Sequence, residues 1–248
     1  NAPVNTDTNS ITTSLQLTNP TPANGGLPAP TLEDLRAAIN SSRQSQDRIV
    51  SKADALARLY TIPSKFGRAY RAAIVPNIAN PLSTNLHIIS MDSSGYLVHS
   101  SDALKKNINR YFNEFRMISD AVDVLDTDII NFGVQFKIVA HPNSNKTLVL
   151  QSTIARLINQ LTISNFQIGQ PIVLGDLINI IINTPGVVSI SEMPKIVNKV
   201  GSIPGSQKTY SPVSYVPSSN TVRGLVICPQ NAIFELKYPN DDIIGTVA

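Results

Sequence analysis

The chain of 248 residues contains no tryptophan, a single cysteine and three histidines. One cysteine, Cys228, cannot form an internal disulfide or a multi-cysteine metal site, and three histidines without cysteine partners leave little for zinc. Charged residues make up 15% of the chain, well under the roughly 25% typical of soluble domains. A surface this poor in charge suits a protein that is largely covered by neighbouring subunits.

Long apolar runs are also missing. The most apolar stretch, 172–182, is interrupted by Gly175, Asp176 and Asn179, and it is too short to span a bilayer. No secretory signal is recognisable, so we expect a protein that is soluble and intracellular when it folds. The chain begins at Asn1 without a methionine, which indicates a fragment or a processed piece. The net charge of +3 is too small to steer nucleic acid.

Apolar residues make up 42% of the chain, enough for a substantial core. Apolar stripes at helical spacing predict helices at 101–116 and 145–161 and a third that begins at Asp176 as its N-cap. Alternating or β-rich runs predict strands at 69–76, 86–91, 96–98, 130–140 and 187–190. Two capping boxes, Thr31–Asp34 and Ser51–Asp54, mark helix starts.

The last third of the chain predicts a different organisation. Residues 191–221 form a Pro/Ser/Tyr-rich connector, and Val222–Cys228 with Ala232–Tyr238 predict a β-hairpin around 229–231. Residues 239–248 are expected to be an arm that packs on another subunit or is disordered. The fold class is therefore α+β, with small, mostly antiparallel sheets covered by helices, a C-terminal β-hairpin and extended arms.

The expected domain organisation has three parts. They are a polar edge strand and linker at 1–30, an α+β core at 31–190 that is either undivided or divided into subdomains at about 31–100 and 101–190, and the connector, hairpin and arm at 191–248.

No catalytic constellation is apparent. Asp123, Asp126 and Asp128 resemble the opening of a calcium loop, but the glycine and the terminal glutamate are absent at the required offsets. No nucleophile elbow, phosphate-binding loop or dinucleotide fingerprint is present, and Cys228 lies in an apolar run typical of a buried, inert thiol. Residues 31–71 carry an excess of basic side chains, but their few aromatics favour a solvated or subunit-contacting face over a nucleic-acid surface. The sequence predicts no enzyme, no cofactor and no metal.

Several motifs occur in a recognisable order: Gly25-Gly26, Thr31–Arg36, Gln46–Asp54 and Pro185-Gly186-Val187. Over about residues 24–200 this order resembles the baseplate J-like family of contractile-tailed phages. The family's Arg-Xaa-Val-Thr-Xaa-Xaa-Asp-Tyr core is matched by Arg48–Ala55, with serine for threonine and alanine for tyrosine. Within the family, Phe234–Tyr238 and the connector before it look most like the large baseplate wedge subunit of T-even-like phages, whose amino-terminal part would be missing.

This resemblance implies a structural role in the virion. Such a late protein would associate with itself and with other baseplate wedge proteins, close into a ring around the hub, and transmit the conformational change that triggers sheath contraction. It would be assembled into the phage tail baseplate in the host cytoplasm. The resemblance implies no membrane, no specific nucleic acid and no small-molecule substrate as partners.

Apolar edges in the C-terminal region are suited to pairing between subunits. The candidate contact residues are Val222, Leu225, Ile227, Phe234, Leu236 and Tyr238. That these residues pack only on their own chain stays open as the alternative. The alternative function is a receptor- or glycan-binding phage tail module, against which the absence of tryptophan argues mildly. A hydrolase would need a close carboxylate pair, and no recognisable spacing offers one.

Overall fold

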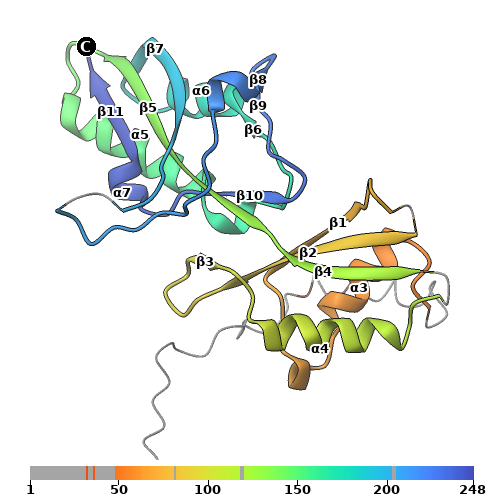
Figure 1. The fold of residues 1–248 in the computed structure, drawn as a ribbon. Coiled ribbons are helices and arrows are strands. Elements are labelled where there is room, and N and C mark those ends of the chain that lie inside the picture. Colours follow the sequence, from red (N-terminus) through yellow and green to blue (C-terminus); the bar gives the residue numbers. More distant parts are fainter. Residues whose placement is uncertain (1–31, 33–35, 37–47, 81, 118–119, 203–204) are drawn as a thin grey trace, which may run out of the picture.

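The structure is a computed structural model that describes residues 32, 36, 48–80, 82–117, 120–202 and 205–248. The expected linker at 1–30 and the capping box at 31–34 lie outside the described residues. The described chain has two parts, each with its own large sheet and its own apolar core (Figure 1). We call residues 48–126 the first body and residues 128–248 the second body.

The first body is a four-stranded sheet covered by two helices. Strand β2 (Ser83–Met91) pairs antiparallel with β1 (Arg71–Pro76) and β3 (Leu97–Val98) and parallel with β4 (Ala121–Asp126). Helices α3 (Lys52–Tyr60) and α4 (Asp102–Asn113) contribute side chains to one core with this sheet, while η1 (Ser64–Phe66) lies between α3 and β1 in the chain. The buried side chains that centre this core include Leu59, Leu86, Ile88, Ile108 and Phe112.

The capping box at Ser51–Asp54 is confirmed. The Ser51 hydroxyl accepts a hydrogen bond from the Asp54 N–H at 3.2 Å, and the Asp54 carboxylate accepts one from the Ser51 N–H at 2.9 Å. The Ser51 N–H lowers the pKa of Asp54 below its ordinary value, because it favours the ionised carboxylate. The reciprocal bonds satisfy two donors at the helix start and set where α3 begins.

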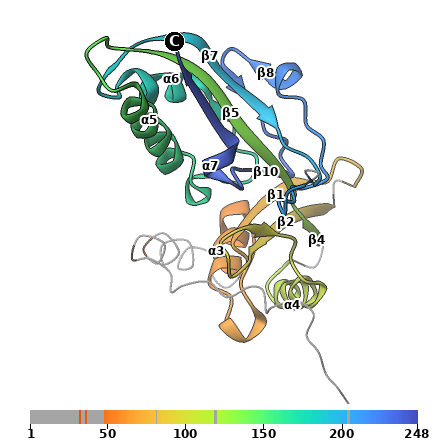
Figure 2. The ribbon, with the colours of Figure 1, turned by 90° about the vertical axis from the view of Figure 1, so that its left-hand side faces the viewer.

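The second body is built around β5 (Asp128–Ala140). This strand pairs antiparallel with β7 (Val187–Asn198), and parallel with β10 (Ala232–Glu235) and then β11 (Ile243–Val247) along successive stretches. Helices α5 (Lys146–Gln160) and α6 (Leu174–Ile182) cover one face of the sheet formed by β5, β7 and β11 (Figure 2). Helix α7 (Pro239–Asp242) joins β10 to β11.

A smaller sheet completes the second body. Strand β9 (Leu225–Val226) pairs antiparallel with β6 (Ile172–Val173) on one side and with β8 (Thr221–Val222) on the other. Two 3-10 helices precede strands of this sheet in the chain: η2 (Ile163–Asn165) comes before β6, and η3 (Pro217–Asn220) comes directly before β8. Within the described residues, every helix is too short or too polar to cross a membrane.

Strands β4 and β5 are separated by one residue, Thr127, so that a nearly continuous strand runs through both bodies (Figure 1). The Thr127 N–H donates to the Ile88 carbonyl of the first body at 3.1 Å, and the next N–H, of Asp128, donates to the Asn231 carbonyl of the second at 2.9 Å. The backbone therefore changes pairing partner from one sheet to the other within two residues.

The α+β class with mostly antiparallel pairing is confirmed, as are the strands expected near 69–76, 86–91, 96–98 and 130–140. The helices expected at 101–116 and 145–161 are observed as α4 and α5. The expected domain boundaries stay predictions. In the described residues the apolar core divides near Thr127, and α4 belongs with the first body.

Four local expectations are wrong. The hairpin of Val222–Cys228 with Ala232–Tyr238 does not form, because β9 pairs with β6 and β8, whereas β10 pairs with β5. Residues 239–248 are no arm, since β11 joins the sheet of its own chain.

The other two errors concern element ends. Strand β7 continues to Asn198, where the sequence predicted a connector from 191, because its pairing with β5 persists through register shifts. Asp176 lies in the first turn of α6, whose N-cap is Val173 without a side-chain cap. The N-cap therefore lies three residues earlier than expected, and the helix starts at Leu174.

Gly133 in β5 lies where the C-terminal segment crosses the sheet closely. A Cβ atom at this position would lie 2.6 Å from the backbone oxygen of Asp242. We expect Gly133→Ala to lower the free energy of unfolding by about 1–3 kcal/mol, because backbone must move to accommodate the methyl group. Urea denaturation followed by circular dichroism measures the change.

Gly175→Ala in α6 is the matched control. Its Cβ would meet only a Val173 methyl group at 3.9 Å, an ordinary contact, so stability should stay the same or rise slightly. Equal losses in the two variants would contradict a close crossing at Gly133.

Candidate functional site

The structure places the candidate reactive groups in separate, structural environments. The Cys228 thiol is buried and donates to the Ala232 carbonyl at 3.3 Å, and burial raises its pKa to about 12. A thiol with so little thiolate is a poor nucleophile. His87 is buried with Nδ1 at 3.1 Å from the Asp126 carbonyl, while His99 and His141 are exposed elsewhere.

The three aspartates that resemble a calcium loop do not converge. Asp123 accepts a hydrogen bond from the Ser83 hydroxyl at 2.6 Å, and Asp126 pairs with Lys105 at 2.8 Å. Asp128 accepts from an asparagine in the loop before β10 at 2.9 Å. Among the described residues, no group of three or more His, Cys, Asp or Glu side chains is placed to hold a metal ion.

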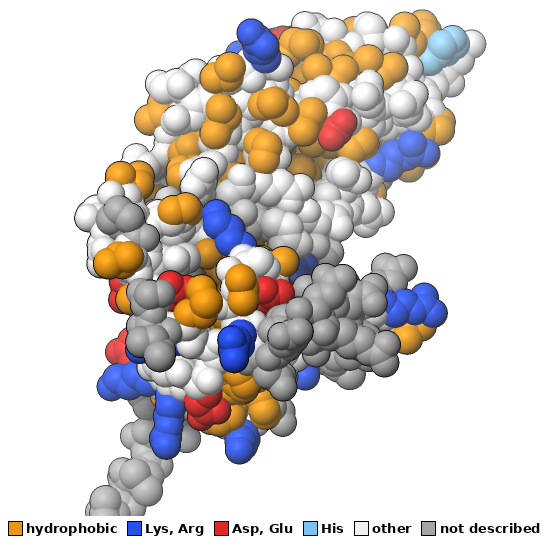
Figure 3. Space-filling view, turned by 90° about the vertical axis from the view of Figure 1, so that its right-hand side faces the viewer, with side chains coloured by type: hydrophobic (Ala, Val, Ile, Leu, Met, Phe, Trp, Pro, Cys, Tyr) orange, Lys and Arg blue, Asp and Glu red, His pale blue; other side chains and the backbone are white. Residues whose placement is uncertain are grey.

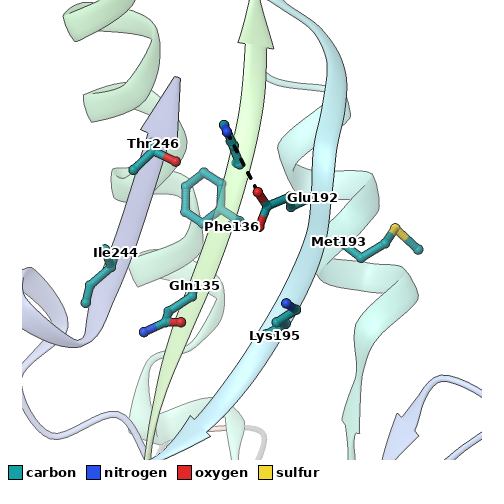
Figure 4. Close-up of a pocket in the computed structure, with 8 residues that line it drawn as sticks. Gln135, Phe136, Glu192, Met193, Lys195, Ile244 and Thr246 are labelled. Atoms are coloured by element: carbon teal, nitrogen blue, oxygen red, sulfur yellow. Dashed lines mark ion pairs between the residues drawn. The ribbon is translucent and has the colours of Figure 1, made fainter. Parts of the chain in front are cut away.

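The open face of the large sheet carries a shallow hollow of about 260 Å³ between β11, β5 and β7 (Figure 4). Helices α5 and α6 lie behind the sheet in this view, and Gln135, Ile244 and Thr246 lie on the open side. Glu192 forms an exposed ion pair with Lys137 at 3.7 Å. Because Glu192 is the one carboxylate that lines the hollow, the carboxylate pair needed for glycoside hydrolysis is not assembled in it.

The six residues predicted as subunit contacts divide into two groups. Phe234 is 0% exposed, with its ring edge-on to those of Phe132 and Tyr215 at centroid distances of 5.8 and 5.5 Å, and Leu236 is also buried. Tyr238 is half-buried among rings of its own chain. Phe234 and Leu236 thus pack within the chain, the alternative that the sequence left open.

The other group lies together on the surface. Val222 is 52% exposed and Leu225 38%, and each stands opposite the other in the β8–β9 ladder. On the other side of Leu225, its partner in β6 is Val173, which is 39% exposed. Residues paired across adjacent strands lie on the same face. Val173, Leu225 and Val222 therefore form a continuous exposed strip, here called the apolar row.

The small sheet is fixed in this orientation by its inner face and its turn. Ile172 and Val226, the neighbours of the row on the opposite face, are buried in the core of the second body. The β8–β9 turn consists of Arg223 and Gly224, both in the left-handed region with φ of 50° and 79°, as two-residue hairpin turns require. Slippage by one residue would bury the row and expose the core residues, so burial specifies the register.

Two exposed charged residues stand next to the apolar row in the chain, Arg223 in the β8–β9 turn and Asp176 in the first turn of α6. Ile227, which follows β9, and Val216, which precedes η3, are also exposed. Figure 3 views the molecule from the side on which β8 and β9 lie in Figure 1. It shows hydrophobic side chains spread over the second body with few charged ones among them.

Sequence reasoning identified Val222, Leu225 and Ile227 but missed Val173. The signal that could have found it is the pair Ile172-Val173 directly before α6, in which two consecutive apolar residues of a strand must point to opposite faces. Nothing local showed that this pair lies beside a strand more than 50 residues later.

Comparisons with known proteins give one kind of match. No known protein family and no curated protein matches the chain. Among solved structures, a chain in "Cryo-EM structure of the anti-feeding prophage (AFP) baseplate, 6-fold symmetrised" is similar, with a TM-score of 0.53 and 12% sequence identity. The similarity covers 86% of this chain and 43% of that chain. The chain thus shares a fold with less than half the length of its structural neighbour.

Cys228 gives a direct test of the buried environment. A rise in its pKa from 9.0 to about 12 lowers the thiolate fraction at pH 8 about a thousandfold. We expect alkylation by iodoacetamide at pH 8 to be slower in the native chain than in the urea-unfolded chain by at least that factor. Comparable rates would show that the thiol is accessible and ionised in the folded protein.

Proposed function

We propose that the chain is a structural subunit of a baseplate in a contractile tail or a related contractile injection system. The observation that carries this proposal is the fold, which matches part of a chain in a baseplate structure over 86% of the present chain. The order of sequence motifs that resembles the baseplate J-like family agrees with this proposal, while no family model matches the chain.

The finer proposal is a wedge subunit like that of T-even-like phages. It would associate with itself and with other wedge proteins in a ring around the hub of the virion tail, and it would transmit the change that triggers sheath contraction. The low charge of 15% favours broad contacts over steering of a charged ligand. We infer a non-enzymatic role, which is supported by the separate, structural environments of Cys228 and the aspartates.

The apolar row is the surface that we assign to subunit contact. Its three aliphatic side chains are adjacent and partly exposed, and full burial of such a side chain stabilises by about 1.5–3 kcal/mol relative to full exposure. Burial of the row by another subunit would therefore add binding free energy to a larger interface, whose rim is expected to be polar and hydrated. The row alone is too small for a stable complex.

Light scattering over a concentration series tests this assignment. We expect the wild-type chain to form dimers or larger species and the double variant Val222→Glu/Leu225→Lys to stay monomeric, because two charges on the contact face would have to be desolvated. The two new side chains stand opposite each other in the β8–β9 ladder and carry opposite charges, so they do not repel each other. Circular dichroism should not change, since both side chains point to solvent.

Leu148→Asp is the matched control, because Leu148 is an exposed leucine at 62% in the first turn of α5, where a carboxylate is tolerated. The control should associate like the wild type. A wild-type chain that stays monomeric at high concentration, or a control that dissociates as fully as the double variant, would contradict the assignment.

Phe234→Asp separates core from contact. We expect this variant to lose its cooperative unfolding transition, since an unpaired carboxylate would replace a fully buried ring. A folded but monomeric Phe234→Asp chain, judged by circular dichroism and light scattering, would place Phe234 in a subunit interface instead.

A further inference from the structure

The two bodies are connected by a narrow covalent link. Within the described residues, the chain passes between them once, at Thr127, whose side chain is fully buried. Their relative orientation must therefore be fixed by contacts across the boundary, here called the seam. Part of the seam is apolar: Tyr70, Ile89 and Leu97 of the first body pack with the core of the second.

A buried carboxylate lies in this seam. Glu235 in β10 is 1% exposed, and its Oε1 accepts a hydrogen bond from the Leu97 N–H of the first body at 2.7 Å. Its Oε2 accepts one from the Asn131 side-chain amide of β5 at 2.6 Å. The two oxygens of one side chain thus join β3 of the first body to β5 of the second.

Asn131 extends the connection to the segment that follows β7. Its side-chain oxygen accepts the Ser211 N–H at 2.6 Å, and its backbone oxygen accepts the Lys199 N–H at 2.9 Å. These acceptor roles fix the side-chain amide so that its NH₂ group faces Glu235. A continuous path of hydrogen bonds therefore runs from Ser211 through the side chains of Asn131 and Glu235 to Leu97, and Lys199 joins it at the Asn131 backbone.

The charges around Glu235 are sparse. Burial raises its pKa above the ordinary value, while the Leu97 N–H, the Asn131 amide and Lys237 oppose this rise and Asp92 adds to it. Lys237 also lies over the ring of Tyr96, 5.7 Å from its centroid. Tyr96 and Asp92 both belong to the turn between β2 and β3 of the first body. A buried carboxylate is costly in free energy unless its oxygens accept hydrogen bonds. Loss of either donor should therefore destabilise the seam.

A second contact lies elsewhere along the seam. The Arg71 guanidinium of β1 donates to the Phe166 and Ser164 carbonyls at 3.4 and 3.0 Å. Arg71 reaches these carbonyls from a partly exposed position, whereas Glu235 is enclosed. Because Glu235 is buried away from water, loss of its hydrogen bonds should cost more free energy than loss of those of Arg71.

We propose that Glu235 is a positioning residue that sets the orientation of the two bodies and couples Lys199 and Ser211 to Leu97 through Asn131. Displacement of the backbone at Ser211 would withdraw the Asn131 side chain from Glu235 and release Leu97. This device concerns motion within one chain and holds whether or not the chain belongs to a baseplate.

Amide hydrogen exchange tests the path. In Glu235→Gln one acceptor oxygen becomes an NH₂ group, which faces either the Leu97 N–H or the Asn131 NH₂ group, so that two donors oppose each other in both orientations. Because the network between Asn131 and Leu97 is then broken, we expect exchange at residues 92–98 to be about ten- to a hundredfold faster than in the wild type, as for loss of one hydrogen bond to a charged group. The double variant Asn131→Asp/Glu235→Gln exchanges the two functional groups and keeps every donor opposite an acceptor. It should restore slow exchange to within about threefold of the wild type.

Glu192→Gln is the matched control, because it removes an exposed carboxylate in the same body and should leave residues 92–98 unchanged. Unchanged exchange in Glu235→Gln would overturn the proposal. So would an equal acceleration of exchange throughout both bodies, which indicates general destabilisation, or a double variant no better than Glu235→Gln.

A distance measurement tests the orientation directly. Spin labels at cysteines replacing Asn109 in α4 and Ala155 in α5, both exposed, report on the two bodies in a Cys228→Ala chain kept dilute enough to be monomeric. We expect one narrow distance distribution with Glu235 and a clearly broader one in Glu235→Ala, with cooperative unfolding retained. Equally wide distance distributions in the two folded chains would contradict the proposed role of Glu235. That outcome would say nothing about subunit assembly.

Discussion

The strand that runs from β4 through Thr127 into β5 is the constraint on which both bodies depend. Its first part pairs with β2, and its second part pairs with β7, β10 and β11. A strand keeps its direction and its alternation over its whole length, so the placement of one sheet limits the placement of the other. Contacts across the seam, such as the hydrogen bonds from the Leu97 N–H to Glu235 and from Arg71 to the Ser164 carbonyl, add to this limit.

Polar groups are used where this long strand is enclosed on both faces. Along most of β5 alternate residues point to the helix-covered core, but Asn131 near its beginning is buried although it lies on the other face. Burial of an amide and a carboxylate side by side is unfavourable unless each finds partners, and Asn131 and Glu235 find them in each other and in two backbone N–H groups. Such a network is specific, since a shifted register leaves buried donors unpaired.

The sequence predicts the parts of this fold that local patterns determine. Alternation from Ile130 to Ala140 and the stripes of α4 and α5 indicate which faces are buried, and Ser51–Asp54 marks the start of α3. The partner of β10 could not be predicted in this way. Its four residues are all buried, as in strands enclosed within parallel sheets, but the proline-containing turn before it is equally typical of a hairpin. That β10 pairs with a strand 104 residues earlier, as Asn131 does with Glu235, depends on tertiary packing. Because the sequence does not give the partner of β10, it also does not show that Phe234 is buried in the core while Val222 is exposed.

The contrast between those two residues bears on function. Single exposed apolar side chains are ordinary on protein surfaces, but Val173, Leu225 and Val222 are contiguous across three strands, two of which, β6 and β9, turn their opposite face to the core. The fold cannot bury both faces of this small sheet with its own described residues, so the outer face is available for another molecule. Reactive groups, by comparison, are individually buried, paired or scattered. The exposed apolar row on one body and the hydrogen-bonded seam between the two bodies are thus the two features on which the proposed subunit contact and the proposed coupling rest.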